Sequence, residues 1–472
     1  MTVSAVDSPA GREERSNAFS WRFVAPLYLG SALNPINSTV IATALVPIAH
    51  YMHVSVGRTS ILVSALYLAC AIAQPTAGKL SEEFGPRRVF QVGIVLVLIG
   101  GIVGGFANDM AMLIVSRVLI GVGTSAGYPS AMLMVRRRAN QAGMDAPPGN
   151  VLGGLAVAGL ATVAIGPAIG GLLVDSFSWR AAFFVNVPFT VAGFAMAWFW
   201  IPRDLPVEDV RGVREVASRI DVAGIAGFGG AMTALLVFLL SLPHPDWVAL
   251  VVAVVVAGGL VWWELRAATP FFDVRQLGSN VALTRTYLRA AGTLLGVYTV
   301  LYGLTQWLEA GHGYSAQTAG LLLLPMGVLS AVLSRWVSAR NLIRRPLIVA
   351  AVSMLVGSVG LLFLTTASPE IAIIGVTLIF AVTIGTTTVG NQTALYTQAR
   401  PEQVGTASGL YRTFSYVGSI ASSVITAIVF RSSVNDQGLH TIAYILAGVA
   451  VVVVAVTVLD RHLPTRPGVT PR

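Results

Sequence analysis

Long apolar runs constrain the fold of this chain more than any other feature. We count fourteen of them, at roughly 22–50, 58–78, 89–107, 110–134, 148–174, 181–202, 221–241, 247–265, 280–307, 315–338, 345–366, 370–396, 403–430 and 440–460. A helix needs about 20 apolar residues to cross a bilayer, and only helices and closed barrels satisfy their backbone groups in lipid. Barrel strands would alternate polar and apolar residues, and these runs do not. The sequence therefore predicts an all-α polytopic membrane protein with fourteen transmembrane helices.

Composition agrees with a membrane protein and excludes several kinds of site. Charged residues make up 11% of the 472 residues, against about 25% in soluble domains. The first twenty residues are polar and lack the apolar stretch of a cleaved signal peptide. Cys70 is the only cysteine and lies in an apolar run, which excludes a disulfide framework and a cysteine metal cluster. We expect no metal and no cofactor.

The net charge of +9 is a topology signal, because short cytoplasmic loops are enriched in Lys and Arg. With the N-terminus inside, 24 of the 30 positive residues fall on inside segments. The outside loops hold Arg58, Arg180 and Arg431, and the remaining three positive residues lie within spans. This distribution predicts cytoplasmic termini and a lipid bilayer as partner, and it leaves no basic patch for nucleic acid.

Polar breaks divide the chain. The longest, 201–221, follows the sixth span, and another, 264–280, follows the eighth. We predict a cytoplasmic tail (1–21), a six-helix bundle (22–202), a cytoplasmic loop with two inserted helices (203–266), a second six-helix bundle (267–460) and a cytoplasmic tail (461–472). Two six-helix halves with a site between them are typical of secondary transporters.

The stretch GKLSEEFGPRRVF (78–90) concentrates charge between two apolar runs. Its glycines permit a tight turn, and Glu82 can pair with Arg87 or Arg88, or face a helix N-terminus for about 0.3–1 kcal/mol. A contact this weak can form in one conformation and break in another. We interpret the loop as a conformational latch made of Gly78, Glu82, Gly85, Arg87 and Arg88. The alternative is a positively charged hairpin with incidental acids.

Three motifs carry a family resemblance. GKLSEEFGPRRVF resembles the signature loop between spans two and three of the major facilitator superfamily, with Glu82 where that family usually has Asp. LIVSRVLIGVGTSAG (113–127) resembles its fourth-span motif, and AIGPAIGGLLVDSFSWRAAFFVNVPF (164–189) is similar to its fifth-span antiporter motif. With fourteen spans, the chain resembles the drug:proton antiporter branch. The resemblance implies two six-helix bundles, alternating access and the proton as coupling ion.

The fifth-span motif contains Gly166, Pro167, Gly170 and Gly171. Small residues and a proline within a membrane helix allow close helix approach and a bend. Such packing also occurs in bundles that transport nothing. In the resembling family the motif accompanies antiport, so it favours efflux over uptake.

Polar groups within spans usually face the bundle interior or a water-filled cavity. The aromatic rings and amides that the predicted spans carry suit an amphipathic organic substrate. For any single one of these residues, interhelical hydrogen bonding is the alternative role. Arg289 and Arg412 lie nearer the cytoplasmic side, where a snorkelling side chain is the simpler interpretation. The predicted cavity residues are Asn34, Asn37, Arg117, Thr124, Tyr128, Tyr298, Tyr302, Gln306, Asn391, Gln392, Arg412 and Tyr416.

Few residues within the predicted spans could couple transport to protons. No acid lies near the centre of a predicted span, and Asn37 stands where many fourteen-span relatives have Asp. A central arginine costs roughly 2.5–3.5 kcal/mol on insertion, so Arg117 is expected to be functional. It can hold an anionic substrate group or hydrogen-bond Asn37. The alternative is a snorkelling side chain, because Arg117 lies only a turn or two from the outer end. Arg117 and Glu309 are the predicted coupling residues. Because Glu309 lies at a helix end, a solvated acid without a role in coupling is the alternative for it.

We therefore expect a monomeric secondary-active exporter of the bacterial inner membrane, acting on drugs or other amphipathic small molecules. An exporter of a lipid or an endogenous metabolite is the alternative within transport. A polytopic membrane enzyme or sensor would need a catalytic His/Asp/Glu cluster or an appended soluble domain, and neither is visible. No G-x-x-x-x-G-K-[ST] loop is present, so direct drive by ATP is not expected.

Overall fold

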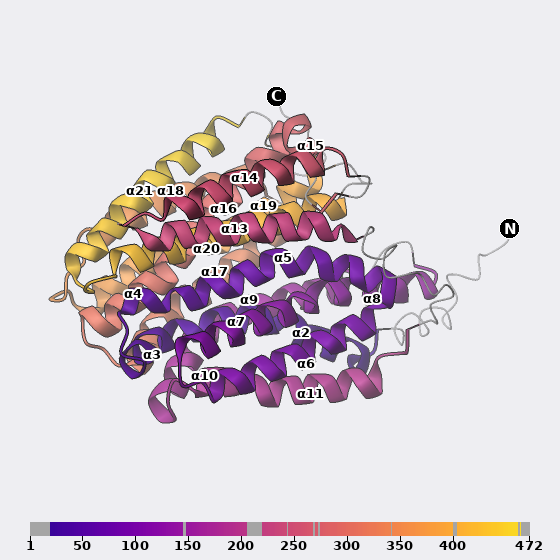
Figure 1. Ribbon diagram of the computed structural model, residues 1–472, viewed down its shortest axis with the longest axis horizontal. Coiled ribbons are helices and arrows are strands. Elements are labelled where there is room, and N and C mark those ends of the chain that lie inside the picture. Colours follow the sequence, from indigo (N-terminus) through magenta and orange to yellow (C-terminus); the bar gives the residue numbers. More distant parts are fainter. Residues whose placement is uncertain are drawn as a thin grey trace.

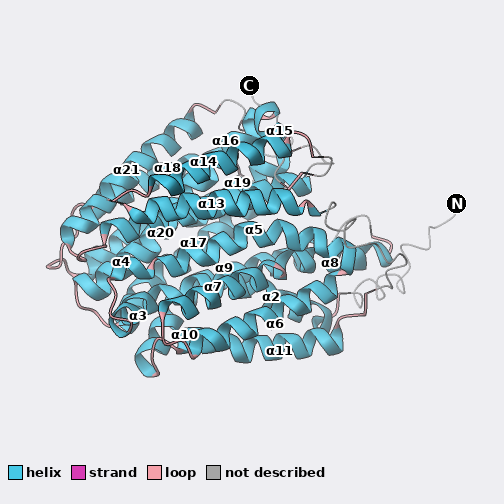
Figure 2. Ribbon diagram, in the orientation of Figure 1, coloured by secondary structure: helices cyan, strands magenta, loops and turns pink. Residues whose placement is uncertain are grey.

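The computed structural model describes residues 19–144, 148–204, 220–242, 244–267, 270–271, 274–340, 342–399, 404–460 and 463. Every regular element in these ranges is a helix, as Figure 2 shows. Most of both predicted tails and of the loop after the sixth span lie outside the described residues, together with the arginines they carry.

The first half of the chain folds into helices that follow the predicted spans closely. They are α2 (Trp21–Val40), continued by η2 (Ile41–Ala44) and α3 (Leu45–Tyr51), then α4 (Val56–Thr59), α5 (Ile61–Phe84), α6 (Pro86–Gly105), α7 (Met110–Ser125), α8 (Gly127–Gln141), α9 (Gly149–Ser176), α10 (Ala181–Phe184) and α11 (Asn186–Trp200).

The second half begins with a hairpin of two apolar helices and continues with six further spans. These elements are α13 (Val222–Ser241), α14 (Trp247–Glu264), the short α15 (Val274–Ser279), α16 (Val281–Thr299), the π-helical turns η3 (Val300–Leu304) and η4 (Trp307–Gly311), α17 (Ala316–Arg340), α18 (Arg344–Leu361), α19 (Glu370–Gln398), α20 (Val404–Val429) and α21 (Asp436–Val458).

Thirteen helical segments of the described chain are long and apolar enough to cross a membrane. The remaining predicted span, 280–307, is α16 extended by η3 and η4 as far as Gly311. π-Helical turns are rare and often occur at functional sites. The prediction of an all-α polytopic membrane protein is confirmed.

The helices form two groups that meet along few elements. In Figure 1 the first half (indigo to purple) lies below the second half (orange to yellow). The main contacts between the groups are α9 against α17 and α5 against α20. Helix α13 touches both α5 and α20 and carries α14 on its other side. Much of α13 and α14 is exposed, as expected for helices that face lipid.

We call the face where α2 begins and α21 ends the terminal face, and the other the opposite face. At the opposite face the two groups touch backbone to backbone: the Gly57 amide donates to the Phe430 carbonyl at 3.2 Å. A Cβ on Gly171 would lie 2.2 Å from the Ala316 carbonyl oxygen. Only residues without a side chain permit this approach.

Candidate functional site between the two bundles

Arg117 is the most deeply buried cation of the first bundle. It projects from α7 and is 1% exposed. Its Nε donates to the Leu62 carbonyl of α5 at 3.1 Å, and its Nη1 donates to the Asn37 carbonyl of α2 at 3.1 Å. Within the described residues, its Nη2 has no hydrogen-bond partner. The arginine thus ties three helices together and keeps one donor free.

The two asparagines of α2 lie in different surroundings. The Asn37 amide exchanges hydrogen bonds of 2.6 and 2.9 Å with Asn186 of α11, so it lies inside the first bundle rather than between the bundles. Asn34 is half-buried and donates to the Thr124 hydroxyl at 3.0 Å and to the Cys70 sulfur at 3.1 Å. Of the two asparagines of α2, Asn34 is the one nearer accessible space.

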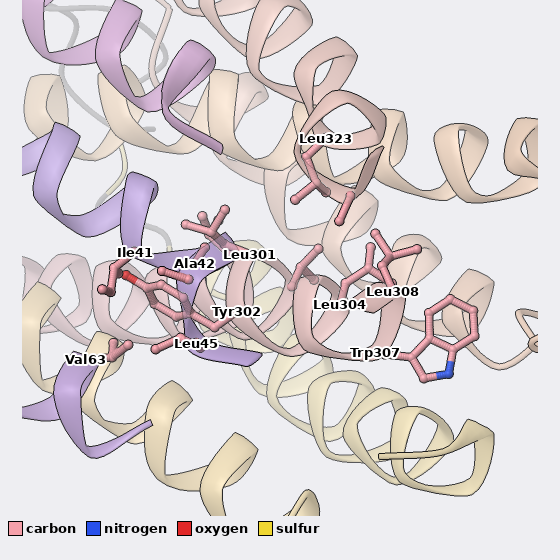
Figure 3. Close-up of a cluster of buried hydrophobic side chains, with 14 of the residues drawn as sticks. Ile41, Ala42, Leu45, Val63, Leu301, Tyr302, Leu304, Trp307, Leu308 and Leu323 are labelled. Atoms are coloured by element: carbon pink, nitrogen blue, oxygen red, sulfur yellow. The ribbon is translucent and has the colours of Figure 1, made fainter. Parts of the chain in front are cut away.

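Four tyrosines from both bundles form the centre of the interface. The Tyr67 hydroxyl of α5 lies 3.0 Å from the Tyr302 hydroxyl of η3, which donates to the Ser38 carbonyl at 2.7 Å. The Tyr67 ring lies 5.1 Å from that of Tyr298 and 5.8 Å from that of Tyr416. Figure 3 shows Tyr302 reaching Ile41 and Ala42 from the η3 turn. We define these four residues as the tyrosine cluster.

Tyr67 was missed by the sequence analysis. It lies in the second span on one helical face with Ser60, Ser64 and Gln74, a polar stripe that could have marked it. Its position opposite Tyr298 and Tyr302 depends on the packing of α5 against the second bundle, which periodicity within one helix does not encode.

Arg412 projects from α20 toward the first bundle. Its Cζ lies 4.2 Å from the centroid of the Tyr128 ring on α8. One turn further along, the Tyr416 hydroxyl donates to Gln74 of α5. Arg412, Tyr128 and Tyr416 are all partly exposed, so this contact between the bundles borders accessible space.

Gln306 and Glu309 lie nearer the opposite face. Gln306 is fully buried and donates to the Ser60 hydroxyl at 3.4 Å. Glu309 is 8% exposed, and its Oε1 lacks a hydrogen-bond partner among the described residues. It interacts electrostatically with Asp175, at the end of α9 in the other bundle.

Asn391 belongs to a network inside the second bundle. It accepts a 2.8 Å hydrogen bond from Arg289 Nε and donates to Thr387 at 3.0 Å. The snorkelling interpretation of Arg289 is wrong: the side chain is 1% exposed and lies 3.6 Å from the Asp460 carboxylate. Asp460 follows the last span and is itself fully buried, so the charge is neutralised inside the protein. Gln392 donates to Tyr396 at 3.2 Å.

The charged loop 78–90 has a different partner from the one predicted. Gly85 has φ +94° and joins α5 to α6. The backbone amides of Arg87 and Arg88 donate to the Asp204 carboxylate at 3.2 and 2.9 Å. Glu82 is exposed, and no described hydrogen bond or ion pair joins it to either arginine. Asp204 therefore occupies the anion position that we assigned to Glu82.

Gly78 contributes little to the turn itself. It lies within α5, and a Cβ there would meet only the Pro129 side chain at 3.9 Å. The Cβ of an alanine would fit there in ordinary van der Waals contact.

The glycines of the fifth-span motif face two different helices. A Cβ on Gly166 would lie 1.9 Å from Thr39 Oγ1, and one on Gly170 would lie 2.6 Å from the Val40 carbonyl, both within the first bundle. Gly171 faces α17 across the interface. Pro167 lies inside α9, and a Cβ on Gly320 of α17 would lie 2.3 Å from its carbonyl. The motif therefore allows α9 to pack closely against both α2 and α17.

Comparison with known proteins identifies relatives over nearly the whole chain. The model of the Major Facilitator Superfamily matches residues 27–423. The uncharacterized MFS-type transporter YwoD of Bacillus subtilis (strain 168) is 33% identical over 92% of this chain and 96% of its own length. The tetracenomycin C resistance and export protein of Streptomyces glaucescens is 29% identical over 88% of this chain and 77% of its own length.

A third relative and one solved structure extend the comparison. The multidrug resistance protein Stp of Mycobacterium tuberculosis (strain CDC 1551 / Oshkosh) is 26% identical over 86% of this chain and 74% of its own length. A crystal structure of a variant of the nucleoside transporter NupG covers 93% of this chain and 99% of its own, with a TM-score of 0.65 at 10% identity. That likeness concerns the fold.

Proposed function

Because this chain belongs to the Major Facilitator Superfamily of membrane transporters, we propose that it is a proton-coupled exporter of drugs or other amphipathic small molecules. The observation that carries the proposal is the tyrosine cluster, where rings and hydroxyls of both bundles meet between Arg117 and Arg412. A small-molecule site needs apolar walls with a few polar groups. Alternating access requires such a site where the two bundles meet.

Three observations support export within the fourteen-span antiporter branch. The chain has the fifth-span glycine motif, the inserted hairpin α13–α14, and relatives named for resistance and export. We also propose a monomer in the bacterial inner membrane, with both termini in the cytoplasm. The distribution of Lys and Arg supports this orientation.

The function is tested by expressing the gene in an efflux-deficient bacterial host and challenging it with a panel of amphipathic antibiotics and dyes. We expect raised tolerance to a subset of the panel, and lower intracellular accumulation of the same compounds. Unchanged tolerance and unchanged accumulation across the panel, with the protein present in the membrane, would refute export of this class.

We propose Glu309 as the proton carrier. It is buried on η4, and closure of the opposite face brings it near Asp175 of the other bundle. Glu309 is buried, whereas Asp175 is exposed. Burial and a nearby negative charge both favour the protonated form of a carboxylic acid. Two further titratable groups, His312 and Asp436, contact Trp307 on the same turn: the Trp307 ring meets that of His312 edge to face, and its Nε1 donates to Asp436 at 3.0 Å. Protonation of Glu309 would therefore favour the closed opposite face.

The coupling proposal predicts a separation of transport from pH. In proteoliposomes with an imposed pH gradient, Glu309→Gln should still move substrate but lose the dependence on the gradient, because the amide resembles the protonated acid. Glu370→Gln is the matched control, since Glu370 is exposed at the start of α19 on the same face. Wild-type flux that ignores the gradient would exclude proton antiport, and a gradient-dependent Glu309→Gln would place the carrier elsewhere.

A further inference from the structure

Arg412 lies where the two bundles meet, with phenols as its neighbours. Its guanidinium stacks over Tyr128 of the other bundle at 4.2 Å. Among the described residues, the phenols of Tyr396, Tyr411 and Tyr416 also lie close to it. A phenol can donate a hydrogen bond to an anion, and its ring face attracts a cation.

Two of the described carboxylates, Asp460 and Asp204, lie in other contacts. Asp460 pairs with Arg285 and Arg289 at the terminal face, and Asp204 accepts from the start of α6. No described carboxylate pairs with Arg412. The cation–π contact contributes only about 0.5–2 kcal/mol, so this positive charge is incompletely compensated.

Arg117 adds a second positive charge, on the other side of the tyrosine cluster from Arg412. It is buried against α2 and α5 by backbone carbonyls, and its Nη2 has no hydrogen-bond partner among the described residues. Two arginines without a carboxylate between them disfavour an organic cation and favour an anion. A guanidinium also presents a planar fork of donors that fits carboxylate or sulfonate oxygens.

Aromatic rings continue from Arg412 toward the centre of the interface, where Tyr298 and Tyr416 are partly exposed and Tyr67 and Tyr302 are buried. Tyr416 lies 5.8 Å from Tyr67, and Tyr67 lies 5.1 Å from Tyr298, which stacks on Tyr302 at 5.7 Å. Ring systems of a ligand pack well against such offset aromatic faces. An anionic group at Arg412 would place an attached ring system along the tyrosine cluster.

We propose that the site selects planar aromatic organic anions, with Arg412 binding the anionic group and the tyrosine cluster contacting the rings. This proposal rests on the proposed function and specifies its substrate class. It separates this chain from transporters that would recognise an aromatic cation with an acidic residue.

The test uses two dyes that share a xanthene ring and differ in charge: fluorescein, an anion, and rhodamine 123, a cation. Purified wild-type protein in proteoliposomes should move fluorescein at least about tenfold faster than rhodamine 123. Arg412→Gln should lower the rate of fluorescein transport about tenfold or more. The rate of Arg412→Lys should lie between those of the wild type and Arg412→Gln, because lysine keeps the positive charge but lacks the planar fork of donors. Fluorescence anisotropy of fluorescein with detergent-solubilised protein gives the Kd of the wild type and of each variant. The variants can then be compared in binding, independently of turnover.

Arg340→Gln is the matched control. Arg340 stacks over Trp336 at the same 4.2 Å, but on the exposed end of α17, so its removal should leave both dyes unaffected. Equal wild-type transport of the two dyes, or normal fluorescein binding by Arg412→Gln, would overturn the anion assignment and leave the exporter proposal standing. A wild-type protein that transports neither dye would also overturn the anion assignment. Whether the protein is an exporter is decided separately, by the tolerance of the efflux-deficient host to the panel of antibiotics and dyes.

Discussion

At the scale of single residues, Arg117 combines a structural and a functional role that one substitution can separate. Its two bonded nitrogens reach carbonyls on α2 and α5, and its third donor is free. Arg117→Ala should abolish transport, and Arg117→Lys should reduce it about tenfold, since lysine reaches fewer acceptors at once. The measurement is substrate flux in proteoliposomes together with thermal stability.

A structural role alone predicts that flux and thermal stability fall in parallel in both variants. The functional role predicts that Arg117→Lys keeps near-normal stability with impaired flux. Arg58→Ala, at an exposed arginine of α4 on the opposite face, is the control for general effects of removing a positive charge. Normal flux in Arg117→Lys would show that the role of Arg117 is structural.

Arg289 shows what the sequence could not reveal about a residue. From its span alone, an arginine near the cytoplasmic side is best interpreted as snorkelling. Its partner Asp460 lies 171 positions later along the chain and beyond the last helix, and Asn391 comes from a third helix. Hydropathy places residues along the membrane normal, but it does not show which helices are neighbours. The pairing required the tertiary structure.

At the scale of elements, the turn between α5 and α6 depends on Asp204. A Cβ at Gly85 would lie 2.4 Å from the Asp204 side chain, and φ there is +94°. The carboxylate caps the first amides of α6, a contact worth about 1 kcal/mol. Asp204→Ala should slow transport about fivefold at normal membrane levels. Asp204→Asn should slow transport less than Asp204→Ala does, because the asparagine side chain keeps one hydrogen-bond acceptor.

Glu82→Gln is the informative comparison for this turn. Glu82 is exposed on the terminal face, so its neutralisation should leave transport unchanged if Asp204 is the operative anion. Transport rates in whole cells, corrected for protein in the membrane, decide the matter. A Glu82→Gln variant as impaired as Asp204→Ala would mean that Glu82 forms the contact with Arg87 or Arg88 in another conformation.

The positions of the elements were predictable because apolar length is a local property. Predicted and observed spans differ by at most seven residues at an end, for example 89–107 against Pro86–Gly105 and 110–134 against Met110–Gln141. The π-helical turns η3 and η4 were not predicted, since nothing in their composition departs from an ordinary helix. The capping acid was also missed, because the residue that reaches a turn across a bundle is set by packing.

At the scale of the whole molecule, the two bundles meet through glycines of α9 and α17. A Cβ on Gly171 would lie 2.2 Å from the Ala316 carbonyl, and one on Gly327 would lie 2.3 Å from the Ala164 carbonyl. Backbone atoms cannot retreat as a flexible side chain can. Closure of the opposite face therefore depends on the absence of side chains at these positions, which gives the fifth-span motif a direct steric role.

Cross-linking across the interface tests this role. The hydroxyls of Ser64 on α5 and Ser423 on α20 lie 2.5 Å apart, so Ser64→Cys with Ser423→Cys should form a disulfide when the opposite face closes. Cys70→Ala removes the only native cysteine. Gly171→Val should lower the cross-linking yield several-fold and block transport, because the valine side chain holds α9 away from α17.

Gly153→Val is the matched control on the same helix, since a Cβ at Gly153 would meet nothing within 4 Å. It should leave both the cross-link and transport intact, which separates the loss of close approach from a general change in helix propensity. Full cross-linking with lost transport in Gly171→Val would place the glycine's role in another step of the cycle. Normal transport would show that the bundles can alternate without this backbone contact.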